Sequence, residues 1–170
     1  MSELTSAVVP AIGPDDHVRG EGPEVVIYMD FGCPRCAAVW AEIRELPLRL
    51  CFRHFPLSAK HPRAPALHAA AEAAANQGAF WEMCDSLFFD RGHVDDPHLW
   101  ERAERFGLDR ERFRADGRSD AVAERIRHDF ESGISAGVSG TPTAFVGGER
   151  MANEIRAKLG ELARARGSFR

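Results

Sequence analysis

A strand, a helix and a second strand follow one another within residues 24–55, and this pattern constrains the fold more than any other feature of the chain. Residues 25–29 form a short apolar run rich in β-branched side chains, which is typical of a buried strand. From Pro34 the apolar residues recur at helical spacing until Pro47 blocks the helix, and residues 48–55 read as a second strand. Such a unit has parallel strands and a right-handed crossover, so we expect an α/β protein.

The rest of the chain is predicted to be mostly helical. Apolar periodicity and capping residues favour helices over 65–76 and 79–89, and others that begin near Asp96, Asp109 and Ser119. A β-hairpin over 143–151 and a terminal helix from Asn153 complete the chain. In the helix after Ser119, one apolar stripe is interpreted as core and not as a cofactor pocket: Val122, Ile126, Phe130 and Ile134.

Length and composition favour one domain. A chain of 170 residues with 44% hydrophobic content can bury one sizeable core and is too short for two ordinary domains. We therefore expect a single domain over residues 17–170, with a helical insertion at about 57–136. Residues 1–16 show little periodicity and end in a turn cluster, which predicts a flexible arm.

Charge and hydropathy argue against several classes of partner. The formal net charge is −4, and charges of both signs alternate in stretches such as residues 100–105, which indicates a solvated helix face and not a nucleic-acid surface. No stretch has the length of a membrane span, and residues 1–16 lack a signal-like pattern, so we expect no membrane association and a cytoplasmic location. Thiols stay reduced in that compartment, so a close cysteine pair there indicates catalysis or metal binding.

The motif Cys33-Pro34-Arg35-Cys36 lies at the turn between the first strand and its helix. At a first helical turn, Cys33 faces unpaired backbone N–H groups and the positive end of the helix dipole, which both stabilise a thiolate. Pro34 is tolerated there, and Arg35 adds a positive charge. Cys36 follows one turn later, where it can close a disulfide with Cys33. We expect thiol–disulfide exchange that uses this redox-active disulfide and needs no metal or organic cofactor.

A zinc site is the alternative for the cysteine pair. Zinc would need two further ligands, and the chain has no second CxxC and no HxxxH motif. Cys51, His54 or Cys84 could serve as ligands only if the fold brings them close to the cysteine pair. Cys51 and Cys84 are both interpreted as inert buried residues. His54, His61 and His68 are left without an assigned role.

Four segments together resemble the DsbA-like thiol–disulfide oxidoreductases over about residues 17–159. They are Phe31-Gly32-Cys33-Pro34-Arg35-Cys36, Phe52-Arg53-His54-Phe55-Pro56-Leu57, Phe80-Trp81-Glu82-Met83 and Gly137-Val138-Ser139-Gly140-Thr141-Pro142-Thr143. The resemblance implies a thioredoxin-like fold, with a central mixed β-sheet flanked by helices and an inserted all-helical subdomain. It also implies that the substrates are protein or small-molecule thiols and disulfides.

The same resemblance implies roles for individual residues. Cys33 becomes the nucleophile and Cys36 the resolving cysteine. Thr141 and Pro142 would face them across a cis peptide bond and, together with Pro34 and Arg35, bind the substrate.

The sequence also departs from the family pattern. Thioredoxin-like proteins often carry a buried acid six residues before the first cysteine, and here that position is Ile27. Asp30 is nearer the motif, but an aspartate that ends a strand is interpreted first as a turn-forming residue. Two other functions stay open: a non-catalytic peptide-binding module at the Thr141-Pro142 face, and a glutathione-dependent isomerase relative, against which the intact cysteine pair argues.

Overall fold

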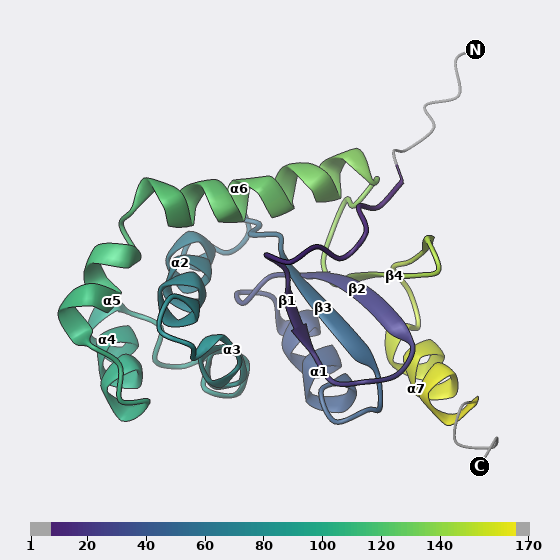
Figure 1. The fold of residues 1–170 in the computed structure, drawn as a ribbon, viewed down its shortest axis with the longest axis horizontal. Coiled ribbons are helices and arrows are strands. Elements are labelled where there is room, and N and C mark those ends of the chain that lie inside the picture. The colour runs from purple at the N-terminus through teal and green to yellow at the C-terminus, as the bar shows by residue number, and fades with distance from the viewer. Residues whose placement is uncertain (1–7, 166–170) are drawn as a thin grey trace.

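The computed structural model describes residues 8–165, so residues 1–7 of the expected arm and the last residues, 166–170, lie outside it. The elements run in the order β1 (His17–Arg19), β2 (Glu24–Met29), α1 (Pro34–Ile43), β3 (Arg49–His54), α2 (Ala64–Ala75), α3 (Phe80–Phe89), α4 (Asp96–Arg105), α5 (Arg110–Asp116), α6 (Asp120–Ser135), β4 (Thr143–Val146), β5 (Glu149–Met151) and α7 (Ile155–Ala165). The helices predicted between the second strand and the hairpin are confirmed, and they form the inserted helical subdomain at the left of Figure 1.

One mixed sheet lies at the centre of the fold, in the strand order β1-β3-β2-β4-β5. β2 and β3 are parallel, as the strand-helix-strand pattern predicts, with Ile27 opposite Phe52. The remaining pairs are antiparallel, and β4 places Ala144 opposite Ile27 on the other side of β2. The α/β thioredoxin-like fold class is confirmed.

The sheet is buried on both faces. Ile27 and Met29 of β2 point into the larger core, which includes residues of α1, α3 and α7. Val26 and Tyr28 point the other way, into a smaller core under α6, which lies along the top of Figure 1. Burial on both faces explains why β2 is a continuous apolar run and not an alternating one.

The packing of α6 matches the predicted stripe only in part. Val122 is buried and the ring of Phe130 stacks on Phe55, but Ile134 is 54% exposed. Asp129 and Gly133 are the other buried residues of the helix. A Cβ atom on Gly133 would lie 2.9 Å from ring atoms of both Phe55 and Tyr28. The helix therefore approaches the sheet closely through its glycine, and this contact turns Ile134 toward solvent.

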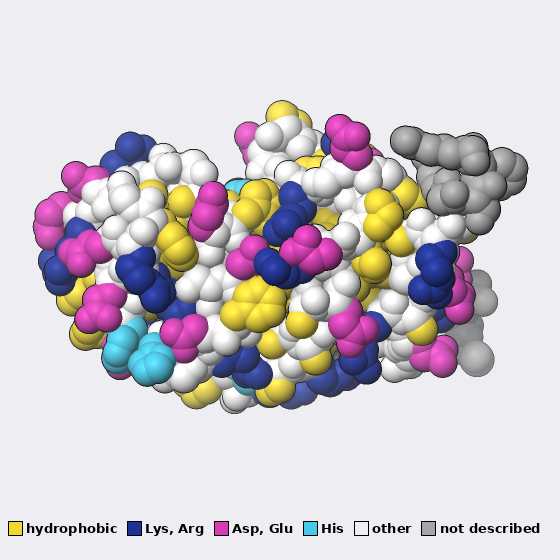
Figure 2. All heavy atoms as spheres, turned by 90° about the horizontal axis from the view of Figure 1, so that it is seen from below, with side chains coloured by type: hydrophobic (Ala, Val, Ile, Leu, Met, Phe, Trp, Pro, Cys, Tyr) yellow, Lys and Arg dark blue, Asp and Glu magenta, His cyan; other side chains and the backbone are white. Residues whose placement is uncertain are grey.

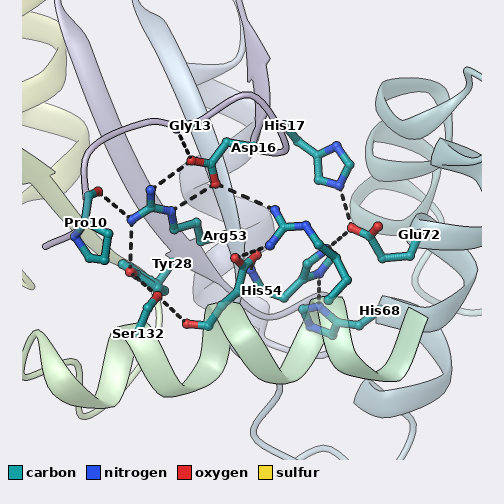
Figure 3. Close-up of polar contacts among 12 residues, drawn as sticks. Pro10, Gly13, Asp16, His17, Tyr28, Arg53, His54, His68, Glu72 and Ser132 are labelled. Carbon is teal, nitrogen blue, oxygen red and sulfur yellow. Dashed lines mark hydrogen bonds and ion pairs between the residues drawn. The ribbon is translucent and has the colours of Figure 1, made fainter. Parts of the chain in front are cut away.

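The expected arm is also held more firmly than predicted in its described part. Arg53 is almost fully buried in β3 and reaches the segment before β1. Its guanidinium donates to the carbonyl of Pro10 at 2.8 Å and to the Asp16 carboxylate at 2.9 Å (Figure 3). It also donates to the carbonyl of Ala11 at 3.1 Å. A buried guanidinium requires such acceptors, so this segment is fixed against the sheet.

Candidate active site

Cys33 is the residue immediately before α1, and Pro34 is the first residue of the helix. The Cys33 backbone is extended, and its N–H donates to the carbonyl of Asp30 at 3.0 Å. Proline fits this position because a first-turn N–H has no partner within the helix. The side chain of Cys33 thus meets the free N–H groups of the helix start, as the sequence predicts.

The local environment strongly favours the thiolate of Cys33. A hydrogen bond from the Cys36 thiol, aided by the backbone N–H groups of Cys36 and Arg35 and by Thr141, lowers the pKa of Cys33 to about 5 against the opposing effect of burial. Cys33 is therefore ionised at neutral pH. The contribution of Arg35 comes through its backbone N–H, while its side chain is exposed. The Cys36 thiol and the backbone N–H groups at the helix start therefore account for the lowered pKa of Cys33, and the predicted charge of Arg35 is not among its main causes.

Cys36 has the opposite character. Its side chain is fully buried, and burial raises the pKa of its thiol well above the usual range. The backbone N–H of Asp30 lies 3.4 Å from Cys36 Sγ. The pair thus contains one ionised sulfur near the surface and one protonated sulfur beneath it.

Thr141 and Pro142 lie opposite Cys33, in the loop before β4. The Thr141–Pro142 peptide bond is cis. The Thr141 carbonyl lies 3.6 Å from Cys33 Sγ, and the buried Thr141 hydroxyl has no hydrogen-bond partner among the described residues. This hydroxyl is free to donate to a Cys33 thiolate.

An open pocket of about 500 Å³ joins these groups. Its lining includes Cys33, Pro34, Arg35, Thr141 and Pro142. Five of the six residues predicted for the site therefore surround one opening, and Cys36 lies beneath it.

Asp30 and His61 belong to the same site, although the sequence analysis gave His61 no role. The buried Asp30 carboxylate accepts from the N–H of Gly32 at 2.9 Å, and His61 Nδ1 lies 2.7 Å from its other oxygen. Although burial opposes ionisation, hydrogen bonds with His68 and His61 lower the pKa of Asp30 to about 2. Asp30 therefore stays ionised, and its bond to Gly32 confirms the turn-forming interpretation.

His61 also lines the pocket beside Cys33. One sequence signal could have pointed to it: His61 follows the carboxyl end of a parallel strand, the edge at which open α/β sheets bind ligands.

A row of buried polar side chains continues from Asp30 into the larger core. His68 Nε2 lies 3.4 Å from Asp30 Oδ1, and His68 Nδ1 lies 2.6 Å from His54 Nδ1. His54 Nε2 in turn contacts Glu72. His68 and Glu72 both belong to α2, but the sequence does not reveal the row because Asp30 and His54 join it only through the packing of the strands against this helix.

The two remaining cysteines, Cys51 and Cys84, belong neither to the pocket around Cys33 nor to the row of buried polar side chains. Burial raises the pKa of Cys51 to about 12 and that of Cys84 well above the usual range. His54 pairs with His68 and Glu72 and not with either thiol. Among residues 8–165, no grouping brings Cys51, His54 and Cys84 around the cysteine pair as the zinc alternative would require.

Residues 24–158 match the sequence profile of the DSBA-like thioredoxin domain. The chain belongs to this DsbA-like family. A solved thioredoxin-like oxidoreductase from Silicibacter pomeroyi DSS-3 is 26% identical, with a TM-score of 0.78 over 91% of this DsbA-like chain and 94% of that chain. The thiol-disulfide exchange protein alpha-DsbA2 from Wolbachia pipientis is 20% identical and shares the fold, with a TM-score of 0.71 over 88% of each chain.

Curated relatives with higher identity are much longer proteins. The chain is 43% identical over 155 residues to the Na(+)/H(+) antiporter NhaA 3 of Salinispora tropica, and 38% identical over 169 residues to the Na(+)/H(+) antiporter NhaA of Herminiimonas arsenicoxydans. The matches cover 86% and 92% of this chain but only 24% and 26% of those relatives. Within residues 8–165, none of the helices has the length and apolar character of a membrane span.

Within this family match the chain keeps an intact cysteine pair, Cys33 and Cys36, at the start of α1.

Proposed function

We propose that the chain exchanges disulfides with protein or small-thiol substrates, with Cys33 as the nucleophile and Cys36 as the resolving cysteine. The observation that carries this proposal is the contrast within the pair. Cys33 is ionised and opens onto the pocket, whereas Cys36 is buried and protonated. Only Cys33 can meet a substrate sulfur first.

The exchange balances without a cofactor. In the reducing direction, the Cys33 thiolate attacks a substrate disulfide, a Cys33–substrate bond forms, and the other substrate sulfur leaves as a thiolate. Cys36 then loses its proton to solvent or to the departing thiolate and attacks Cys33 Sγ, which releases the second substrate sulfur and closes the Cys33–Cys36 disulfide. Two electrons pass to the substrate, and the reverse sequence oxidises a dithiol.

The low pKa of Cys33 bears on the direction of exchange. Every interaction that stabilises its thiolate stabilises the reduced pair, and this makes the oxidised pair the stronger oxidant. The direction in the cell depends also on the compartment, and the cytoplasmic location stays a prediction.

The pocket supplies the proposed substrate surface. Pro34 and Arg35 line one side, and Thr141 and Pro142 line the other. A peptide that lies along the Thr141 backbone would present its sulfur to Cys33.

An insulin-reduction assay with dithiothreitol tests the proposal. We expect Cys33→Ser to abolish turnover above the uncatalysed rate, and Cys84→Ala, which removes a buried thiol outside the pocket, to keep it. Equal rates for the wild type and Cys33→Ser would contradict the enzyme and leave the peptide-binding module.

We also propose a Na(+)/H(+) antiporter as a partner, because longer proteins of that name contain a segment that is 43% identical to this chain. In those longer proteins the matching segment meets the rest of the chain at high effective concentration, which favours recognition between the two parts. The test uses Cys36→Ala, which traps mixed disulfides on Cys33. We expect a disulfide-linked adduct with an antiporter from the same cell. Dithiothreitol should reverse it, and the Cys33→Ser/Cys36→Ala variant should not form it. Failure to find an antiporter among the trapped adducts would contradict the partnership.

A further inference from the structure

Three side chains from three separate elements converge at the far end of the polar row. His17 projects from β1, His54 from the end of β3 and Glu72 from α2 (Figure 3). Glu72 Oε1 lies 2.5 Å from His17 Nε2 and 2.5 Å from His54 Nε2. The potential ligand atoms of all three residues lie within 4.8 Å of one another.

We propose that His17, His54 and Glu72 bind a divalent transition-metal ion, with zinc as the favoured occupant. Two imidazole nitrogens and one carboxylate are donors that zinc accepts in proteins, with a further position left for water. Bonds of about 2.0–2.2 Å in a tetrahedral arrangement separate neighbouring ligand atoms by about 3.3 Å. The two 2.5 Å contacts therefore need to open by less than about 1 Å to admit the ion.

Burial favours this site and still leaves a route to it. The His54 side chain is fully buried, and that of Glu72 is 7% exposed. The His17 side chain keeps 15% exposure, so an ion can enter past it and hold water on that side. The His17 ring stacks on Phe80 at a centroid distance of 3.6 Å, which fixes its orientation.

The neighbouring histidine supplies the outer support that metal-binding imidazoles normally have. When Nε2 of His54 binds the ion, its proton must sit on Nδ1, which lies 2.6 Å from His68 Nδ1. His68 then carries its own proton on Nε2, which lies 3.4 Å from the Asp30 carboxylate, and the Phe31 N–H that lies 3.4 Å from the same nitrogen loses its acceptor in this state. Asp30, His68 and His54 would thus form the carboxylate–histidine–metal arrangement that supports many metal ligands, with one additional histidine between the carboxylate and the ligand.

Nearby charges leave the site able to hold a cation. Two guanidinium groups lie near the site: Arg125 pairs with Asp129 at 2.5 Å, and Arg53 pairs with Asp16 at 2.9 Å. These two carboxylates offset the two positive charges, while Glu72 contributes a negative charge within the site itself.

A cobalt titration tests the proposal, because Co²⁺ occupies zinc sites and reports its ligands by visible absorption. The Cys33→Ser/Cys36→Ser chain is used so that the reactive pair cannot bind the metal. We expect one equivalent of Co²⁺ per chain, displaced by Zn²⁺, with d–d bands and no thiolate charge-transfer band. His17→Gln in the same background should weaken Co²⁺ binding by more than the about 10- to 100-fold typical of an outer-shell change.

His98→Gln is the matched control, because His98 belongs to an exposed histidine pair with His93 whose ring centroids lie 4.8 Å apart. It should leave Co²⁺ binding unchanged. His17 is partly exposed on an edge strand, so its glutamine variant should keep the fold, which far-ultraviolet circular dichroism checks. Equal Co²⁺ binding by the parent and His17→Gln, loss of binding in His98→Gln, or no binding by the parent would each overturn the proposal.

Discussion

At the scale of single residues, the two cysteines of one short motif differ because one lies at a helix start and the other lies a turn deeper. Hydrogen bonds at the helix start lower the pKa of Cys33 to about 5, and burial raises that of Cys36. The Thr141 hydroxyl is the one contributor from outside the motif that can be removed without touching the helix.

Thr141→Val should therefore raise the pKa of Cys33. Valine keeps the shape of the side chain but cannot donate to the thiolate. A hydrogen bond to a charged group contributes about 1.5–3 kcal/mol, so we expect a rise of about one to two pKa units. The pH dependence of alkylation by iodoacetamide, followed by mass spectrometry at Cys33, measures it. Thr143→Val is the control, because the Thr143 hydroxyl already donates to the carbonyl of Gly140 at 2.7 Å. If the pH midpoint of Cys33 alkylation is the same in Thr141→Val and Thr143→Val, the Thr141 hydroxyl does not stabilise the thiolate.

The sequence could reveal those residues of the site that belong to short local motifs. Cys33 and Cys36 share one helix turn, and Thr141 and Pro142 stand in a recognisable string. The contact of Asp30 with His61 joins residues 31 positions apart, and that of His17 with Glu72 joins residues 55 positions apart. No local pattern encodes such pairs, because they form only when the strands and α2 are packed together.

At the scale of elements, the close approach of α6 to the sheet depends on Gly133. Gly133→Ala should lower the free energy of unfolding by about 1–3 kcal/mol, because the added methyl group meets the rings of Phe55 and Tyr28 at 2.9 Å. Urea denaturation measures the change.

Gly160→Ala, in α7, provides the comparison. Its new methyl group would meet only the flexible end of Arg164, at 3.4 Å or more, so alanine should leave stability unchanged or raise it by up to about 1 kcal/mol through helix propensity. A similar loss of unfolding free energy in Gly133→Ala and Gly160→Ala would contradict a special role for the contact between α6 and the sheet.

The elements themselves were predictable because their periodicity is strong and their caps are explicit. Asp109 and Ser119 accept hydrogen bonds from the backbone N–H groups of Arg112 and Val122, as expected of capping residues. The apolar stripe of α6 was predicted correctly at Val122 and Phe130 and wrongly at Ile134, because the stripe does not reveal that Gly133, one residue earlier, makes the closest contact with the sheet.

At the scale of the whole molecule, Asp30 ties the sheet to the helical subdomain. Its carboxylate accepts from the N–H of Leu57 at 3.0 Å, and it contacts His68 of α2. The folded-state pKa of Asp30, about 2, lies below its ordinary value of 3.8, so the folded state binds fewer protons than the unfolded state between these values. Its stabilising contribution is present above pH 3.8 and is lost as the pH falls toward 2.

Asp30→Asn should remove this acid-dependent loss, which amounts to about 2 kcal/mol. Unfolding free energies measured by urea denaturation between pH 5 and pH 2 test this, with Asp15→Asn as the control because Asp15 is exposed. If the unfolding free energy of Asp30→Asn falls as steeply with pH as that of the wild type, Asp30 does not cause the loss of stability in acid.

The surface of the whole molecule is consistent with its charge pattern. On the face seen in Figure 2, basic and acidic side chains are interspersed, in agreement with the alternating signs of the sequence. The firm attachment of residues 10–16 was not predictable, because it depends on the burial of Arg53 and leaves no mark in the segment that Arg53 holds.

Both outer strands of the sheet are short. β1 and β5 each contain three residues, and β5 presents Glu149 and Arg150 at its edge. An exposed strand edge invites pairing with another chain, and short, charged edges offer few free backbone groups for it. The short edges of this open, apolar sheet therefore oppose the edge-to-edge aggregation that such sheets otherwise promote.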